Sequence, residues 1–262
     1  MAYQFIHRRR EGTVEYVTLN RPDVRNAFNE HVIQELTEWA EAVAADAEVR
    51  VAILAGQGPA FCAGADLTWM ASMASHTHAE NVLDATAMAR MYSAIDGLPI
   101  PLIGRIHGIA LGGGAGLAAV CDIVVAEEHS VFGFTEVKVG LLPAVVSPYV
   151  LAKIGASAAR ELFLTGMRFD AARAKDIGLV HAVVATDQMD QRVADYVQEI
   201  LAAAPEAIAT TKELLRKVAG RPVQDTIGLT ADTIAVRRSS PEGQEGMRAF
   251  LEKRKASWNV SR

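Results

Sequence analysis

Cysteine is scarce in this chain, which has only Cys62 and Cys121 among its 262 residues. So few cysteines exclude a disulfide framework and favour a reducing compartment, and we expect the cytoplasm. Apolar runs are also short: none reaches the roughly 18 residues that a membrane-spanning helix needs. The first residues lack the apolar centre of a secretory signal. These absences predict a protein that works without a membrane.

Basic residues are also fewer than acidic ones. The chain carries 26 Lys and Arg against 31 Asp and Glu, a formal net charge of −5, so we expect no nucleic-acid partner. The longest basic run, 8–10, lies in an alternating segment that is typical of an edge strand. His76 and His78 have a weak metal-like spacing but no acidic or cysteine partner beside them, so we expect no metal ion.

Hydrophobic residues, by contrast, make up half of the chain, enough for one large domain or for one domain with a helical appendage. The apolar spacing predicts helices near 29–43 and 79–95. It predicts strands at 4–10, 13–19, 49–55, 101–106, 122–126 and 130–134. From Ser147 the pattern is helical almost to the end, with breaks at Gly155, Gly166, Gly178, Pro205, Gly220 and Pro241. We place a soft boundary between a core of residues 1–195 and a helical region of residues 196–262.

Three consecutive glycines, Gly112–Gly114, lie between a buried strand and a small apolar helix. Such a turn can bare backbone N–H groups at the positive end of a helix, where a charged or polarised oxygen is stabilised. A tight turn with close packing explains the run equally well. The dinucleotide fingerprint fails at Leu117, and no P-loop lysine follows.

A second glycine-containing turn precedes Ala65, so the N–H groups of Ala65 and Gly113 could converge into an oxyanion hole. Glu136 lies among aromatic and aliphatic neighbours. If it is buried, its pKa should be raised, which suits general acid–base work. The alternative is a surface glutamate that opens a loop.

Taken together, these segments resemble the enoyl-CoA hydratase/isomerase (crotonase) superfamily. The matching motifs cover essentially the whole chain. They are Asn20–Pro22 with Asn26–Ala27, Ala60–Leu67, His107–Gly114, Cys121–Asp122, Phe132–Gly133 with Glu136, Gly140–Pro143, Leu164–Gly166, Ala174 with Gly178–Val180, and Glu245–Arg254.

The resemblance implies an α/β fold, a spiral core of ββα units with a C-terminal helical region that forms trimers or dimers of trimers. It implies a coenzyme A thioester as substrate and no separate cofactor. Its oxyanion donors correspond to Ala65 and Gly113, and its acid–base glutamate to Glu136. The substrate-binding positions correspond to Val24, Arg25, Ala27, Ala63, Asp66, Leu67, Gly112, Gly116, Ala144, Phe250 and Lys253. Phe250 and Lys253 resemble tail residues that reach the CoA of a neighbouring subunit.

Two departures from the family pattern stand out. Hydratases often carry a lysine where this chain has Asp23, and Arg25 could take over its role. Typical hydratases also have a first glutamate where this chain has Gly116. Loss of a side chain there predicts extra space beside the thioester, for a bulky, branched or β-substituted acyl group.

Three functions stay open at this point. The first is hydration of an enoyl-CoA, a carbon–oxygen lyase reaction. The segment 144–150 resembles a subgroup that acts on branched, carboxylated esters of the 3-methylglutaconyl type, met in leucine breakdown. The second is double-bond isomerisation with Glu136 alone. The third is a CoA-ester binding subunit with little activity.

Overall fold

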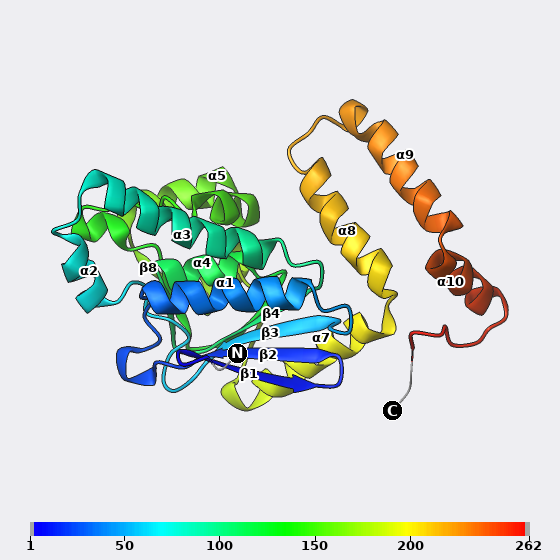
Figure 1. Ribbon diagram of the computed structural model, residues 1–262, viewed down its shortest axis with the longest axis horizontal. Coiled ribbons are helices and arrows are strands. Elements are labelled where there is room, and N and C mark those ends of the chain that lie inside the picture. The colour runs from blue at the N-terminus through cyan, green and yellow to red at the C-terminus, as the bar shows by residue number, and fades with distance from the viewer. Residues whose placement is uncertain (1–2, 260–262) are drawn as a thin grey trace.

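The computed structural model describes residues 3–259 and contains two sheets and ten α-helices within that range (Figure 1). The large sheet has the spatial order β1 (Ile6–Glu11), β2 (Val14–Leu19), β3 (Val51–Gly56), β4 (Leu102–Ile106), β6 (Ile123–Glu127) and β9 (Ala182–Val184). Only β1 runs antiparallel to its neighbour. The small sheet has the order β5 (Ile109–Leu111), β7 (Val131–Gly133) and β8 (Arg168–Asp170).

The helices alternate with strands in the first half of the chain and follow one another in the second. They are α1 (Glu30–Ala44), α2 (Leu67–Met73), α3 (His78–Asp96), α4 (Gly113–Val120), α5 (Ser147–Thr165), α6 (Ala171–Asp176), α7 (Met189–Ala202), α8 (Pro205–Val218), α9 (Val223–Ser239) and α10 (Pro241–Leu251). Three short 3-10 helices are η1 (Pro22–Val24), η2 (Glu136–Val139) and η3 (Thr186–Gln188). The expected α/β class is confirmed.

Several predicted elements form where their residue patterns place them. Asn29 caps α1, because its side-chain oxygen accepts a hydrogen bond from the N–H of Val32 at 3.0 Å. The buried positions of α1 include Ile33, Leu36 and Val43, at the helical spacing that predicted the element.

The helical pattern predicted after Ser147 misses two short strands, which follow its breaks at Gly166 and Gly178. β8 pairs with β7, with Asp170 opposite Val131, and β9 pairs with β6, with Ala182 opposite Val125. Both strands are three residues long, and so is β5. Such short strands show no periodicity of their own and exist because a distant segment supplies their hydrogen bonds.

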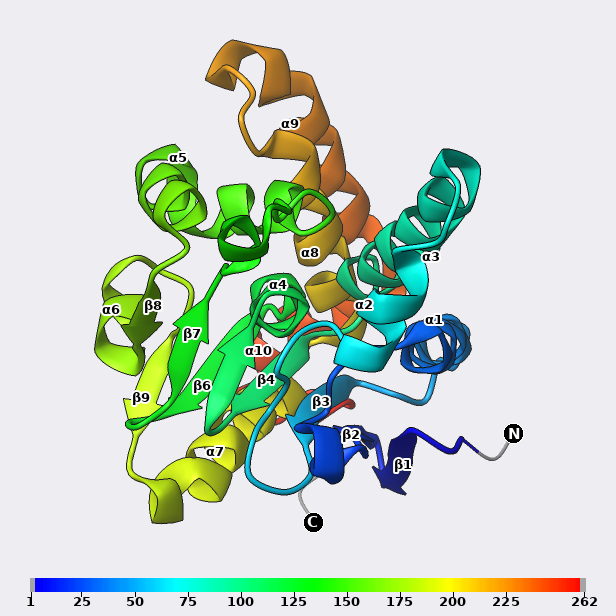
Figure 2. The same ribbon diagram turned by 90° about the vertical axis from the view of Figure 1, so that its left-hand side faces the viewer.

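Helices cover both faces of the large sheet (Figure 2). α1, α3 and α4 lie over one face, where Trp39, Tyr92 and Phe28 belong to the main apolar cluster. α7 lies across the opposite face, over a smaller cluster that includes Ile53 and Val193. The glycine turn at the start of α4 therefore lies on the face of the sheet that carries the larger apolar cluster.

The last three helices leave the core as an arm (Figure 1). Lys212 on α8 holds this arm to the core: its Nζ lies 2.6 Å from Asp122 Oδ2 and donates to the Ile100 carbonyl at 3.0 Å. The expected boundary between residues 195 and 196 falls inside α7, and the arm departs after that helix. No helix in residues 3–259 is long and apolar enough to cross a bilayer.

Candidate active site

The turn before Ala65 and the glycine turn lie side by side. Cys62 forms an isolated bridge with Ala110. The N–H of Cys62 donates to the Ile109 carbonyl, and the N–H of Leu111 donates to the Cys62 carbonyl, both at 3.0 Å. These bonds bring the predicted oxyanion segments together, although they are separated by almost fifty residues of chain.

The glycine turn is both tight and closely packed. Gly112 has φ 51° and ψ −119°, a conformation that favours glycine, and its N–H donates to the Gly133 carbonyl at 2.8 Å. A Cβ on Gly113 would lie 2.6 Å from Phe28 Cε2, and one on Gly114 would collide with the Cys62 carbonyl. Close packing therefore explains why the run consists of glycines. It does not exclude a second role for Gly113 as a hydrogen-bond donor.

Two backbone donors remain available beside this turn. Within residues 3–259, the N–H groups of Ala65 and Gly113 have no hydrogen-bond acceptor. Gly113 is the first residue of α4, so its N–H is at the positive end of the helix. Ala65 is exposed. Both N–H groups are therefore unpaired, which is one requirement for a donor of an oxyanion hole.

The loop around Ala65 is held firmly on both sides. The N–H of Phe28 donates to the Gly64 carbonyl and the N–H of Asp66 donates to the Phe28 carbonyl, both at 2.7 Å. The Asp66 carboxylate also caps α2, accepting from the Thr68 N–H at 2.8 Å, and lies 2.7 Å from a guanidinium nitrogen of Arg21.

Asp66 is therefore a structural carboxylate. Burial alone would raise its pKa, but Arg21 and the N–H groups at the start of α2 outweigh burial and lower the pKa. The side chain is buried and its contacts are internal. Within the predicted binding segment, Asp66 helps to hold the neighbouring Ala65 in place.

Glu136 opens η2 and points back to the glycine turn. A Cβ on Gly112 would lie 3.3 Å from Glu136 Oε1, so the carboxylate lies against the turn that precedes Gly113. Burial raises the pKa of Glu136, and its own backbone N–H opposes that rise. Its Oε2 is buried without a hydrogen-bond partner among the described residues. A carboxylate with these properties is suited to proton transfer.

The expectation of extra space at Gly116 is wrong. A Cβ on Gly116 would collide with Cγ1 of Val146, and it would lie 3.0 Å from Val146 Cβ and 3.1 Å from Tyr92 Oη. Val146, just before α5, and Tyr92, on α3, fill the volume that the missing side chain leaves. The absent glutamate is replaced by packed side chains, without a second carboxylate.

Sequence reasoning missed Tyr92. Its ring is fully buried, and its hydroxyl donates to the Gly113 carbonyl at 2.7 Å. Burial raises the pKa of Tyr92 well above its ordinary value, and the nearby Glu136 adds to that rise. The only signal in the sequence is a tyrosine among the buried positions of α3, next to Met91 and one turn before Ile95. Its partner becomes visible only when α3 packs on α4.

The remaining predicted binding residues fall into two groups. Near the donor loops, Val24 and Arg25 are exposed, and the Arg25 carbonyl accepts from the Ala63 N–H at 2.9 Å. Leu67 and Ala144 are exposed as well, while Ala27 is buried. Phe250 lies on α10 and Lys253 lies just after it, in the arm, far from α2 (Figure 1). Phe250 is 83% exposed.

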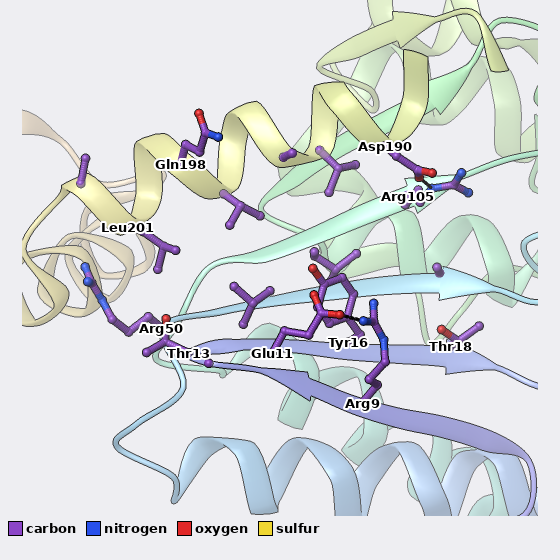
Figure 3. Close-up of a pocket in the computed structure, with 18 of the residues that line it drawn as sticks. Arg9, Glu11, Thr13, Tyr16, Thr18, Arg50, Arg105, Asp190, Gln198 and Leu201 are labelled. Carbon is purple, nitrogen blue, oxygen red and sulfur yellow. Dashed lines mark hydrogen bonds and ion pairs between the residues drawn. The ribbon is translucent and has the colours of Figure 1, made fainter. Parts of the chain in front are cut away.

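A large cavity of about 1080 Å³ lies elsewhere, between α7 and the outer face of β1–β3 (Figure 3). Its charges are largely paired: Arg9 with Glu11, and Arg105 with Asp190 at 2.7 Å. The guanidinium of Arg9 lies over the Tyr16 ring. None of the predicted site residues lines this cavity, so its size does not mark the reaction site.

Comparisons with known proteins identify the family and the fold. The model of the family "Enoyl-CoA hydratase/isomerase" matches residues 9–261. A 2,3-dehydroadipyl-CoA hydratase of Escherichia coli is 31% identical over 94% of each chain. The crystal structure of an enoyl-CoA hydratase from Shewanella pealeana is 37% identical, with a TM-score of 0.94 over 98% of this chain and 96% of that chain. An enoyl-CoA hydratase structure from Mycobacterium smegmatis is 33% identical, with a TM-score of 0.93 over 98% and 100%.

The chain therefore belongs to the enoyl-CoA hydratase/isomerase family. The expected crotonase-like core with a C-terminal helical region is confirmed by the solved structures, and the protein is an enzyme of that family.

Proposed function

We propose that this enzyme adds water across the 2,3 double bond of an enoyl-CoA thioester. The thioester oxygen accepts hydrogen bonds from the N–H groups of Ala65 and Gly113. Glu136 takes a proton from water while the water oxygen bonds to the β-carbon. The electron pair of the double bond moves to the thioester oxygen as an enolate, and Glu136 then returns the proton to the α-carbon. The product is the 3-hydroxyacyl ester, which contains all the atoms of the enoyl ester and of one water.

The contact of Glu136 with the glycine turn carries this proposal. The carboxylate lies against Gly112, one residue from the Gly113 donor, so the base and the proposed oxyanion site share one small volume. The raised pKa of Glu136 lets the side chain hold a proton between the two steps. The two donors are fixed by their loops before charge develops, which makes such stabilisation effective.

Exposed residues beside the donor loops support the binding of CoA. Arg25 can offer counter-charge to phosphate groups, and its carbonyl is tied to the Ala63 loop. We propose that Phe250 and Lys253 act on the CoA of a neighbouring copy in a trimer or dimer of trimers. Both residues are exposed on the arm, which lies far from α2 in this chain (Figure 1), and this supports that assignment. The two free buried cysteines support a reducing compartment, and we propose the cytoplasm.

The acyl group is the finer part of the proposal. The segment 144–150 favours a branched, carboxylated ester of the 3-methylglutaconyl type. The packing of Val146 against Gly116 gives no added support, because the space expected for a branch is filled. The packing at Gly116 therefore weighs against a branch at that point of the acyl group.

Double-bond isomerisation is the second candidate, and one observation favours it. The place of a second glutamate holds Val146 and Tyr92, so no second carboxylate lies there among the described residues. Moving one proton between the α- and γ-carbons needs only Glu136.

A panel of CoA esters with product masses separates the two reactions. The panel holds linear, branched and carboxylated 2-enoyl-CoA esters and the matching 3-enoyl-CoA esters. We expect the 2-enoyl esters that the enzyme accepts to gain the mass of one water. Conversion of 3-enoyl to 2-enoyl esters, with no gain of mass in any member, would overturn the hydratase proposal in favour of isomerisation.

A further inference from the structure

We infer that Tyr92 is a positioning residue for the Gly113 oxyanion donor, an assignment that rests on the proposed function. Tyr92 lies on α3 and its hydroxyl donates to the Gly113 carbonyl at 2.7 Å. That carbonyl belongs to the same residue whose N–H faces the thioester oxygen. The hydroxyl therefore ties the donor residue to a neighbouring helix.

A run of three glycines needs such an external support. Glycine has the widest choice of backbone conformations, so contacts with neighbouring segments must fix the direction of the N–H groups in the run. A displacement of a reacting group by about 1 Å can lower the reaction rate about a hundredfold. Tyr92 Oη lies 3.0 Å from the Cβ position of Gly113 and 3.1 Å from that of Gly116, so it spans the first turn of α4. The first turn is thus held at the residue that donates.

Burial makes this hydrogen bond a fixed one. Tyr92 is 0% exposed, so water does not compete for its hydroxyl. Its ring packs against Tyr149 at 5.9 Å between centroids, which limits its movement. The hydroxyl is fully buried and is bonded to the Gly113 carbonyl, so it holds the donor residue in place.

The test replaces Tyr92 with Phe, which keeps the ring and removes the hydrogen bond. We expect kcat for 2-butenoyl-CoA to fall about tenfold with KM nearly unchanged, a smaller loss than the hundredfold or more that removal of a donor itself costs. Tyr196→Phe is the matched control, because its hydroxyl bonds Arg192 on α7, on the other side of the sheet. The control should keep the wild-type kcat.

Infrared spectroscopy gives a readout that a purely structural role would not move. The probe is butanoyl-CoA labelled at its carbonyl carbon and bound at saturation. In the wild type we expect the carbonyl stretch to shift to lower frequency, because two N–H groups polarise the thioester. In Tyr92→Phe the shift should shrink, and in Tyr196→Phe it should equal that of the wild type.

The outcomes separate this inference from the proposed function. A wild-type shift that persists in full in a folded Tyr92→Phe enzyme with wild-type kcat overturns the role of Tyr92 alone. A wild type with no shift on binding overturns the oxyanion hole itself. If Tyr92→Phe does not fold, fluorotyrosine at position 92 keeps the hydroxyl and makes it a stronger donor. An enlarged carbonyl shift then supports the role, and an unchanged shift overturns it.

Discussion

Val146 occupies the space beside Gly116 so completely that a single added carbon has no room. A Cβ on Gly116 would collide with Val146 Cγ1 and lie 3.0 Å from Val146 Cβ. This contact explains why a helix carries glycine at a position where helix propensity disfavours it. It also leaves Glu136 as the carboxylate that lies against the glycine turn.

The Gly116→Ala substitution should therefore destabilise the protein. Overpacking a core costs about 1–3 kcal/mol, more than the roughly 0.5–1 kcal/mol that alanine gains over glycine in a helix. Urea unfolding measures the difference. Gly228→Ala on α9 is the matched control, because Gly228 has nothing within 4 Å of its Cβ position, and this variant should be neutral or stabilised. Equal stabilisation of both variants would show that Val146 does not fill the site.

The protonation of Glu136 should be visible in stability. Its folded pKa is raised above the ordinary 4.5, mainly by burial. Its contribution to stability is therefore fully present below pH 4.5 and is lost as the pH rises through the folded pKa. Glu136→Gln should be more stable than the wild type at pH 7, and this advantage should shrink as the pH falls toward 4.5. Unfolding titrations across that range check it, and a constant difference would contradict the raised pKa.

The Arg21–Asp66 ion pair should stabilise the protein more than an exposed ion pair with the same distance between nitrogen and oxygen. Its guanidinium nitrogen and carboxylate oxygen lie 2.7 Å apart, with 17% and 8% of the side chains exposed. Arg21→Met leaves a buried carboxylate unpaired and should cost about 3–5 kcal/mol. It should also lower kcat, since Asp66 holds the loop of Ala65. The control is Arg173→Met, whose partner Glu161 also lies at 2.7 Å but in an exposed pair, and it should cost at most about 1 kcal/mol. Equal losses would contradict the account.

Acid should weaken the contribution of Asp66. Its pKa is lowered in the folded protein despite burial, because Arg21 and the N–H groups of α2 outweigh burial. The stability that it adds is present above its ordinary 3.8 and is lost as the pH falls through the lowered value. Asp66→Asn should lack the part of the acid-induced loss of stability that protonation of Asp66 causes in the wild type. An acid curve of unchanged shape would contradict the assignment.

The arm should loosen when Lys212 is replaced. Lys212→Met removes the contacts of α8 with Asp122 and the Ile100 carbonyl, and should cost about 1.5–3 kcal/mol, the range for hydrogen bonds to charged groups. Protease cleavage around the start of α8 should become faster. Lys217→Met on the same helix removes an exposed pair with Glu213 and should leave cleavage unchanged. The same cleavage rate in both variants would show that Lys212 does not hold the arm.

The residue pattern predicts the elements that carry their own periodicity. α1 has a capping Asn29 and a regular apolar face, so local sequence defines it. β8 and β9 depend on partners in β7 and β6, and no three-residue window shows that pairing. The site divides in the same way. Gly112 and Glu136 stand out as residue types in their motifs. The contact of Tyr92 with Gly113, and the filling of the Gly116 space by Val146, depend on how α3 and α5 pack against α4.

The most direct test of the central claim is the turnover of Glu136→Gln with 2-butenoyl-CoA, measured beside the affinity for butanoyl-CoA. Glutamine keeps the shape of the side chain but cannot accept and return a proton. We predict that kcat falls by at least about a hundredfold, within the usual contribution of a general acid–base group, while the affinity changes little. Glu199→Gln, at an exposed position on α7, should match the wild type in both measurements. Unchanged turnover in Glu136→Gln would contradict the account.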